Sequence, residues 1–277
     1  MLSGLFSAFM LHSWEATSVV AVAAGVVGFF VVLRGSTFAA HAIPQGAFTG
    51  AAAAALLGTS TLLGAGVFSF LAVGALARWG RRGRHDVVTA LVLVIMLATG
   101  SLFLSVGSQY AQQTFSLLFG EPLAVSSAYL WPTVGLAAAC TGLVLVSYRR
   151  LLLTSAAPEL AGAGGVSPAA VNFWFLLAIG AATTLALPVV GALLVFSLMI
   201  GPPAAARSLT ARPGVALGLS VLLALVTTWA ALVGAYWSNW PLGFFVGVAA
   251  VLWYLLGRGA KAWGHRPRTA PAVGSSR

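Results

Sequence analysis

Apolar residues along this chain are grouped into nine runs, each close to the length that crosses a lipid bilayer as a helix. The runs occupy approximately residues 17–33, 38–57, 60–77, 87–106, 128–147, 170–187, 189–206, 214–235 and 242–257. The stretch 171–206 is too long for one span, so we divide it near Leu187 and Pro188, where proline removes a backbone donor. The pattern predicts an all-α polytopic membrane protein with about nine transmembrane helices.

The composition supports this fold class over a soluble one. Only 6% of the 277 residues are charged and 60% are hydrophobic, whereas a soluble domain carries about a quarter of its residues as charges. The net charge of +10 would suit a nucleic-acid-binding protein, but a basic patch needs a solvated face, which so apolar a chain lacks. We therefore expect no nucleic-acid partner.

The basic residues instead indicate how the helices are oriented, because Lys and Arg gather in cytoplasmic loops. With nine spans, every basic cluster falls on one side of the membrane, which predicts an external N-terminus and an internal C-terminus. The clusters are Arg34; Arg78, Arg81, Arg82 and Arg84; Arg149 and Arg150; Arg207 and Arg212; and Arg258, Lys261, Arg266, Arg268 and Arg277. Their charge would also attract anionic lipid headgroups. Residues 1–260 are expected to form one transmembrane domain, and 261–277 a disordered cytoplasmic tail.

The second run begins with polar residues that a lipid-facing helix does not need. His41 and Gln45 are four residues apart and share one helix face. A neutral imidazole beside an amide can line a polar passage or ligate a borderline metal cation. A hydrogen bond between helices of the bundle is the alternative that this spacing leaves open.

The loop between the fifth and sixth runs contains the signals of a short helix, at about residues 155–166. Pro158 suits the first turn of a helix and Glu159 complements its positive end. The glycines within residues 162–165 then end it. A short helix lying along the membrane face is suited to docking into another protein, and an ordinary linker is the alternative.

Prolines mark the seventh run as a broken span. Pro188 precedes it, Gly191 follows closely, and Pro202 and Pro203 lie about three-quarters of the way along. Backbone groups freed by a break are tolerated only against protein or a water-lined cavity. Broken helices at membrane depth often line transport sites, so these four residues are candidates for a transport pathway.

Four short motifs occur in a fixed order along the chain. They are residues 30–35 (FVVLRG); 119–126 (FGEPLAVS); 157–161 (APELA) with Gly165 and Val166; and 190–194 (VGALL) with Pro202 or Pro203, Ala206 and Arg207. In this order, over roughly residues 17–257, the chain resembles the permease subunits of bacterial zinc and manganese uptake ABC transporters.

This resemblance implies a multi-pass permease of the bacterial cell membrane that imports a divalent transition metal, zinc or manganese. Its implied partners are a second permease copy or paralogue, two cytoplasmic ABC ATPase subunits and an extracytoplasmic metal-binding protein. The residues that match the family's coupling helix, which sits in a groove of the ATPase, are Pro158, Glu159, Leu160, Ala161 and Gly165. The outer segment 107–127, including Glu121, would face the binding protein. The alternative is an interfacial helix with Tyr110 and Phe115 inward.

The sequence departs from the family at the metal site. Family members carry an Asp and, four residues later, a His on the second span, where this chain has His41 and Gln45. A pair without negative charge is a weaker metal site. Three explanations are open. The metal is held by few protein groups, a partner subunit supplies the missing negative charge, or the cargo is a metal chelate or another small non-metal molecule. Divalent metal remains the leading cargo.

No catalytic site is expected in this chain. It has no Walker A motif and its single lysine is Lys261, so ATP would act only through partner subunits. No His-Glu-x-x-His motif occurs, and the single aspartate, Asp86, excludes an aspartate pair. A proton-driven carrier is less favoured because no acid lies in the middle of a run. We expect no permanently bound cofactor, only the transported metal.

Overall fold

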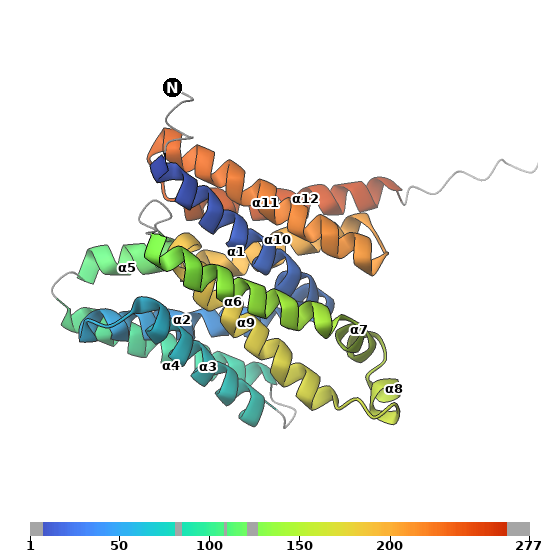
Figure 1. The fold of residues 1–277 in the computed structure, drawn as a ribbon. Helices are drawn as coiled ribbons and strands as arrows, with labels where there is room; N and C mark the ends of the chain where they lie inside the picture. Colours follow the sequence, from blue (N-terminus) through green and yellow to red (C-terminus); the bar gives the residue numbers. More distant parts are fainter. Residues whose placement is uncertain (1–7, 81–84, 108–109, 121–126, 265–277) are drawn as a thin grey trace, which may run out of the picture.

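The computed structural model describes residues 8–80, 85–107, 110–120 and 127–264, and all regular structure in these ranges is helical. The helices are α1 (Ala8–Leu33), α2 (Thr37–Leu57), α3 (Thr61–Trp79), α4 (His85–Val106), α5 (Tyr110–Phe119), α6 (Ser127–Val146), α7 (Tyr148–Ala156), α8 (Pro158–Ala163), α9 (Pro168–Val190), α10 (Ala192–Leu209), α11 (Pro213–Ser238) and α12 (Leu242–Gly264). The long helices run side by side as a bundle, with α5 at one end and α7 and α8 at the other (Figure 1).

Nine of these helices correspond to the nine apolar runs. Eight of them are long and apolar enough to cross a membrane, namely α1, α3, α4, α6, α9, α10, α11 and α12. The ninth, α2, is 21 residues long and carries His41, Gln45 and Thr49. It packs against α3 and α4 and also contacts α9, α10 and α5, so other helices surround it. The prediction of an all-α polytopic membrane protein is confirmed.

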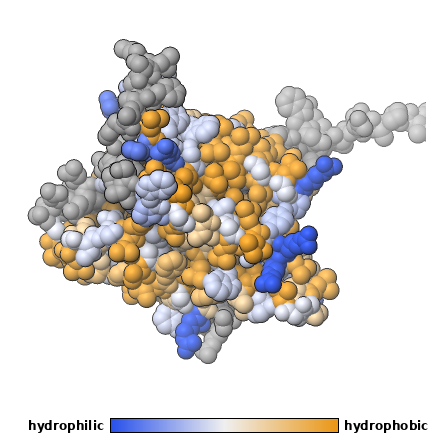
Figure 2. Space-filling view, in the orientation of Figure 1, coloured by the Kyte–Doolittle hydropathy of each residue, from blue (hydrophilic) through white to orange (hydrophobic). Residues whose placement is uncertain are grey.

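The surface of the bundle is suited to lipid. Figure 2 shows apolar side chains over most of the visible face, and strongly hydrophilic residues at only a few places. Large apolar side chains are exposed along α4 and α12 in particular, including Leu91, Ile95, Leu252 and Leu256, each more than half exposed. Because no hydrophobic force draws helices together in lipid, cohesion must come from close packing inside the bundle.

Small residues provide that packing where α2 crosses α3. Gly50 of α2 and Gly64 of α3 lie backbone to backbone, and a Cβ added at Gly50 would be 1.9 Å from the Gly64 carbonyl oxygen. On the other side of α2, the Thr49 hydroxyl donates a hydrogen bond to the Met96 carbonyl oxygen of α4. α2 is therefore held firmly between its neighbours by contacts that larger residues would prevent.

The break between α9 and α10 lies later than the sequence predicted. α9 continues through Pro188, and the chain turns at Gly191, which has φ 86° and ψ 155°. Only glycine adopts this conformation without strain. A Cβ at Gly191 would lie 2.3 Å from the Leu118 carbonyl oxygen at the end of α5. Proline near the end of a helix costs a single backbone hydrogen bond, so the glycine sets the turn.

The predicted interruption at Pro202 and Pro203 is also absent, because α10 continues through both residues. Pro203 has no N–H to donate to the Met199 carbonyl, which instead lies against Gly28 of α1. A Cβ added at Gly28 would be 2.4 Å from that oxygen. Both prolines are buried. Pro203 packs against Gly28 of α1, and the place of both prolines on a transport pathway stays a prediction.

Among the described residues, Arg34 and Arg207, which belong to two different basic clusters, lie at the same end of the bundle, as the positive-inside argument requires. Arg34 donates a 2.8 Å hydrogen bond to Thr154 of α7, and Arg207 of α10 donates a 3.3 Å bond to the Val32 carbonyl oxygen of α1. Which side of the membrane this end faces stays a prediction. Residues 261–264, assigned by sequence to the disordered tail, belong to α12, which continues to Gly264. The rest of the tail lies outside the described residues.

Candidate functional site

The start of α2 is fixed by a three-residue turn after α1. Gly35 has φ 66°, and the N–H of Ser36 donates a 3.0 Å hydrogen bond to the Val31 carbonyl oxygen, which closes the end of α1. This bond pattern with a left-handed glycine ends many helices. α2 begins at Thr37, one turn before His41. The motif FVVLRG therefore positions the polar helix relative to α1.

His41 lies at a small pocket near this end of α2. The pocket has a volume of about 260 Å³ and is lined by Thr37, Phe38, His41 and Phe196. The His41 ring meets the Phe196 ring of α10 edge-on, with centroids 4.7 Å apart and planes at 64°. His41 Nδ1 is buried without a hydrogen-bond partner. The imidazole therefore borders the pocket beside Phe196 with one ring nitrogen unpaired.

Gln45 is enclosed rather than exposed to that pocket. Its side chain is 2% exposed, and its Oε1 atom has no hydrogen-bond partner. The hydroxyl of Thr49, one turn further, donates to the Gln45 backbone carbonyl oxygen at 2.8 Å and not to this side-chain oxygen. The structure thus places both residues on α2 with the predicted spacing, but only His41 lines the pocket.

The described residues offer an incomplete set of metal ligands. They contain no group of three or more His, Cys, Asp and Glu side chains that could hold a metal ion. His41 and Gln45 would supply one imidazole nitrogen and one amide oxygen, whereas divalent transition metals take four to six ligands. These two donors alone are too few for a complete coordination shell.

The short helix α8 forms close to where the sequence predicted it. Pro158 occupies its first turn, and the Val166 N–H closes its end with a 2.9 Å bond to the Ala161 carbonyl oxygen. Ala161 is fully buried, whereas Glu159 is exposed and Leu160 is 67% exposed. A helix that is held to the bundle by buried Ala161 and that exposes Leu160 offers an apolar surface suited to a protein partner. The preceding helix α7 was not predicted as a separate element.

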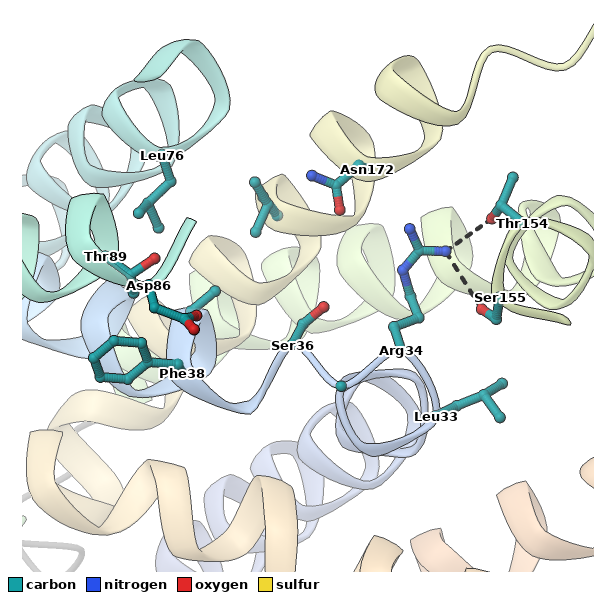
Figure 3. Close-up of a pocket in the computed structure, with 13 residues that line it drawn as sticks. Leu33, Arg34, Ser36, Phe38, Leu76, Asp86, Thr89, Thr154, Ser155 and Asn172 are labelled. Carbon is teal, nitrogen blue, oxygen red and sulfur yellow. Dashed lines mark hydrogen bonds between the residues drawn. The ribbon is translucent and has the colours of Figure 1, made fainter. Parts of the chain in front are cut away.

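A second cavity lies at the same end of the bundle, with a volume of about 380 Å³ (Figure 3). Polar side chains line it from four parts of the chain, including Arg34, Asp86, Thr154 and Asn172. Arg34 projects toward Thr154 and Ser155, and burial lowers the pKa of its guanidinium. The sequence did not identify this arrangement, because Thr154 is 120 residues from Arg34.

The outer segment is described only in part. Residues 110–119 form α5, whereas Glu121, the predicted contact with the binding protein, lies outside the described residues. Phe115 is 51% exposed on α5, and the alternative of a helix at the membrane interface stays a prediction. Its ring packs on Phe119, with centroids 4.9 Å apart.

Comparisons with known proteins agree over nearly the whole chain. A sequence model described as the ABC 3 transport family matches residues 7–258. The "Manganese transport system membrane protein MntC" of Halalkalibacterium halodurans is 29% identical over 233 residues, which are 83% of this chain and 78% of that protein. The "Manganese import system permease protein ScaB" of Streptococcus gordonii is 28% identical over 200 residues, 72% of each chain. A solved structure of PsaBC from Streptococcus pneumoniae in complex with Fab superposes with a TM-score of 0.83 at 25% identity, covering 92% of this chain and 93% of that one.

Proposed function

Because this chain belongs to the ABC 3 transport family, we propose that it is the permease subunit of a bacterial ABC importer for a divalent transition metal. The observation that carries the proposal is the family match over residues 7–258 of a bundle in which α2, the helix with His41 and Gln45, packs against several other helices. Manganese is the first cargo to test, since relatives along most of the chain are named for its transport, and zinc is the second.

The metal would pass His41 at the small pocket between α2 and α10. An imidazole nitrogen suits zinc and manganese, and the amide oxygen of Gln45 is a donor suited to manganese. Gln45 is enclosed, so it would reach the ion only if α2 moves during transport. A second permease copy would complete the coordination shell, because this chain offers two donors without negative charge.

Energy for transport would come from partner subunits. ATPase subunits would bind α8 through Glu159 and Leu160, which are exposed on a helix anchored by buried Ala161. An extracytoplasmic metal-binding protein would dock at the opposite end, on the segment that includes α5 and Glu121. Anionic lipids would lie next to the basic end of the bundle.

Removal of the His41 imidazole tests whether the pocket is on the path. The complete complex, reconstituted in vesicles with ATP, is assayed for uptake of radioactive manganese and zinc. His41→Ala should lower uptake by about tenfold or more, since few protein groups remain to hold the ion. His12→Ala is the matched control, because His12 pairs with Glu15 on α1, away from this pocket. Equal uptake by both variants would remove His41 from the path.

A further inference from the structure

A single arginine side chain links the last turn of α7 to the turn before α2. Arg34 Nη1 donates hydrogen bonds to the hydroxyl oxygens of Thr154, at 2.8 Å, and Ser155, at 3.4 Å. Its guanidinium carbon lies 5.3 Å from the ring centroid of Phe175 on α9. The two hydrogen bonds hold the side chain against the end of α7 (Figure 3).

The chemistry of this link allows it to be broken and remade. Its acceptors are neutral hydroxyls, and hydrogen bonds to neutral groups are weaker than those to a carboxylate. Within the part of the chain that the structure describes, His12 and Glu15 are the single pair at ion-pair distance, so Arg34 has no carboxylate partner there. Arg34 Nε has no partner, and the side chain lines the 380 Å³ cavity, which leaves room for it to move.

Each end of the link lies next to a functional element. Thr154 and Ser155 belong to the last turn of α7, which ends at Ala156, and α8 begins two residues later at Pro158. The hydroxyls also bond to carbonyl oxygens of the preceding turn of α7, so they move with that helix. Arg34 is three residues before Thr37, the first residue of α2, and His41 follows one turn later.

We propose that Arg34 is a positioning residue that couples α8 to α2, so that displacement of α8 by an ATPase subunit moves the start of the helix that carries His41. The proposal rests on the proposed function, which makes α8 the docking helix. The positive-inside rule, which sets the orientation of the protein in the membrane, is enough to explain a cluster of cytoplasmic arginines. Orientation does not require that one of them be half-buried and bonded to the helix that leads into α8.

The test uses the reconstituted complex and measures ATP hydrolysis with and without manganese, together with manganese uptake. Arg34→Gln should reduce the stimulation by metal at least about fivefold, the lower end of typical coupling between sites. Metal-independent hydrolysis should stay within about twofold of wild type, because α8 still docks. Arg34→Lys, which keeps a charged donor, should retain part of the stimulation. Arg150→Gln is the control, since Arg150 is exposed on α7, the helix that carries Thr154 and Ser155.

The acceptor side provides a second set of variants in case Arg34→Gln does not assemble. The double variant Thr154→Val with Ser155→Ala removes both hydroxyls at nearly constant shape and should reproduce the loss of stimulation. Thr154→Ser keeps the hydroxyl and should behave as wild type. Full stimulation in the double variant, or an equal loss in Arg150→Gln, would overturn the link. If the wild-type complex itself shows no stimulation by any metal, the proposed function fails and this proposal fails with it.

Discussion

At the scale of single residues, the turn between α9 and α10 depends on Gly191. Its backbone conformation is open to glycine alone, and its Cα faces the end of α5 without room for a side chain. The turn therefore joins α9, α10 and the outer segment at one point.

We predict that Gly191→Ala destabilises the protein strongly. The backbone strain alone costs about 1–3 kcal/mol, and the contact with the Leu118 carbonyl oxygen at 2.3 Å adds to it. Gly218→Ala is the matched control, because nothing lies within 4 Å of a Cβ there, and it should leave stability unchanged or raised by up to about 1 kcal/mol. Thermal unfolding in detergent measures both. Equal midpoints for the two variants would contradict the account.

The turn at Gly191 lies three residues after the break that the sequence predicted. Proline rules placed the break at Pro188, because they consider the local chain only. The glycine is needed because Leu118 and Gly120 lie against it, and that contact joins residues about 70 positions apart. The partners of Arg34 were missed for the same reason. His41 and Gln45 were placed correctly on one helix, but which of them opens on a pocket depends on Phe196 of α10.

At the scale of elements, the hydrophobic pattern predicted all nine long helices because each carries a long run of apolar residues, and eight of them are apolar enough to cross a bilayer. It did not predict α7, because Tyr148–Ala156 carries Arg149 and Arg150 in its first turn and is not an apolar run. α8 was predictable because its start carries Pro158 and its end carries glycines, which are local signals.

We predict that Leu160→Ala on α8 weakens coupling to the ATPase without affecting insertion. Leu160 is 67% exposed, so its loss leaves no cavity in the bundle, whereas a bound partner would lose a buried apolar contact. Leu153→Ala is the control, since Leu153 is 40% exposed on neighbouring α7. Co-purification of the ATPase subunit and metal-stimulated hydrolysis should both fall by about threefold or more for Leu160→Ala alone. No difference between the two variants would remove α8 as the docking helix.

At the scale of the whole molecule, the positions of the arginines in the fold agree with the grouping that the sequence predicted. The arginines at the ends of α1, α7 and α10 meet at one end of the bundle, although the sequence placed them together only through the count of spans. The sidedness of that end follows from the positive-inside rule, which expects it in the cytoplasm.

Cysteine labelling tests this orientation. The single cysteine, Cys140, is 2% exposed, so the wild-type protein should not react with a membrane-impermeant maleimide. Ser60→Cys lies in the α2–α3 turn, at the end away from Arg34, and should be labelled in intact cells. Arg150→Cys should be labelled only after the membrane is opened. The reverse pattern would invert the predicted topology.

The central claim is that this bundle passes a divalent metal when partner subunits hydrolyse ATP. The most direct measurement is the ATPase rate of the reconstituted wild-type complex, with its binding protein, in the absence of metal and with manganese, zinc or iron. The account predicts that manganese raises the rate, with zinc next and iron least. An unchanged rate with all three metals would contradict it.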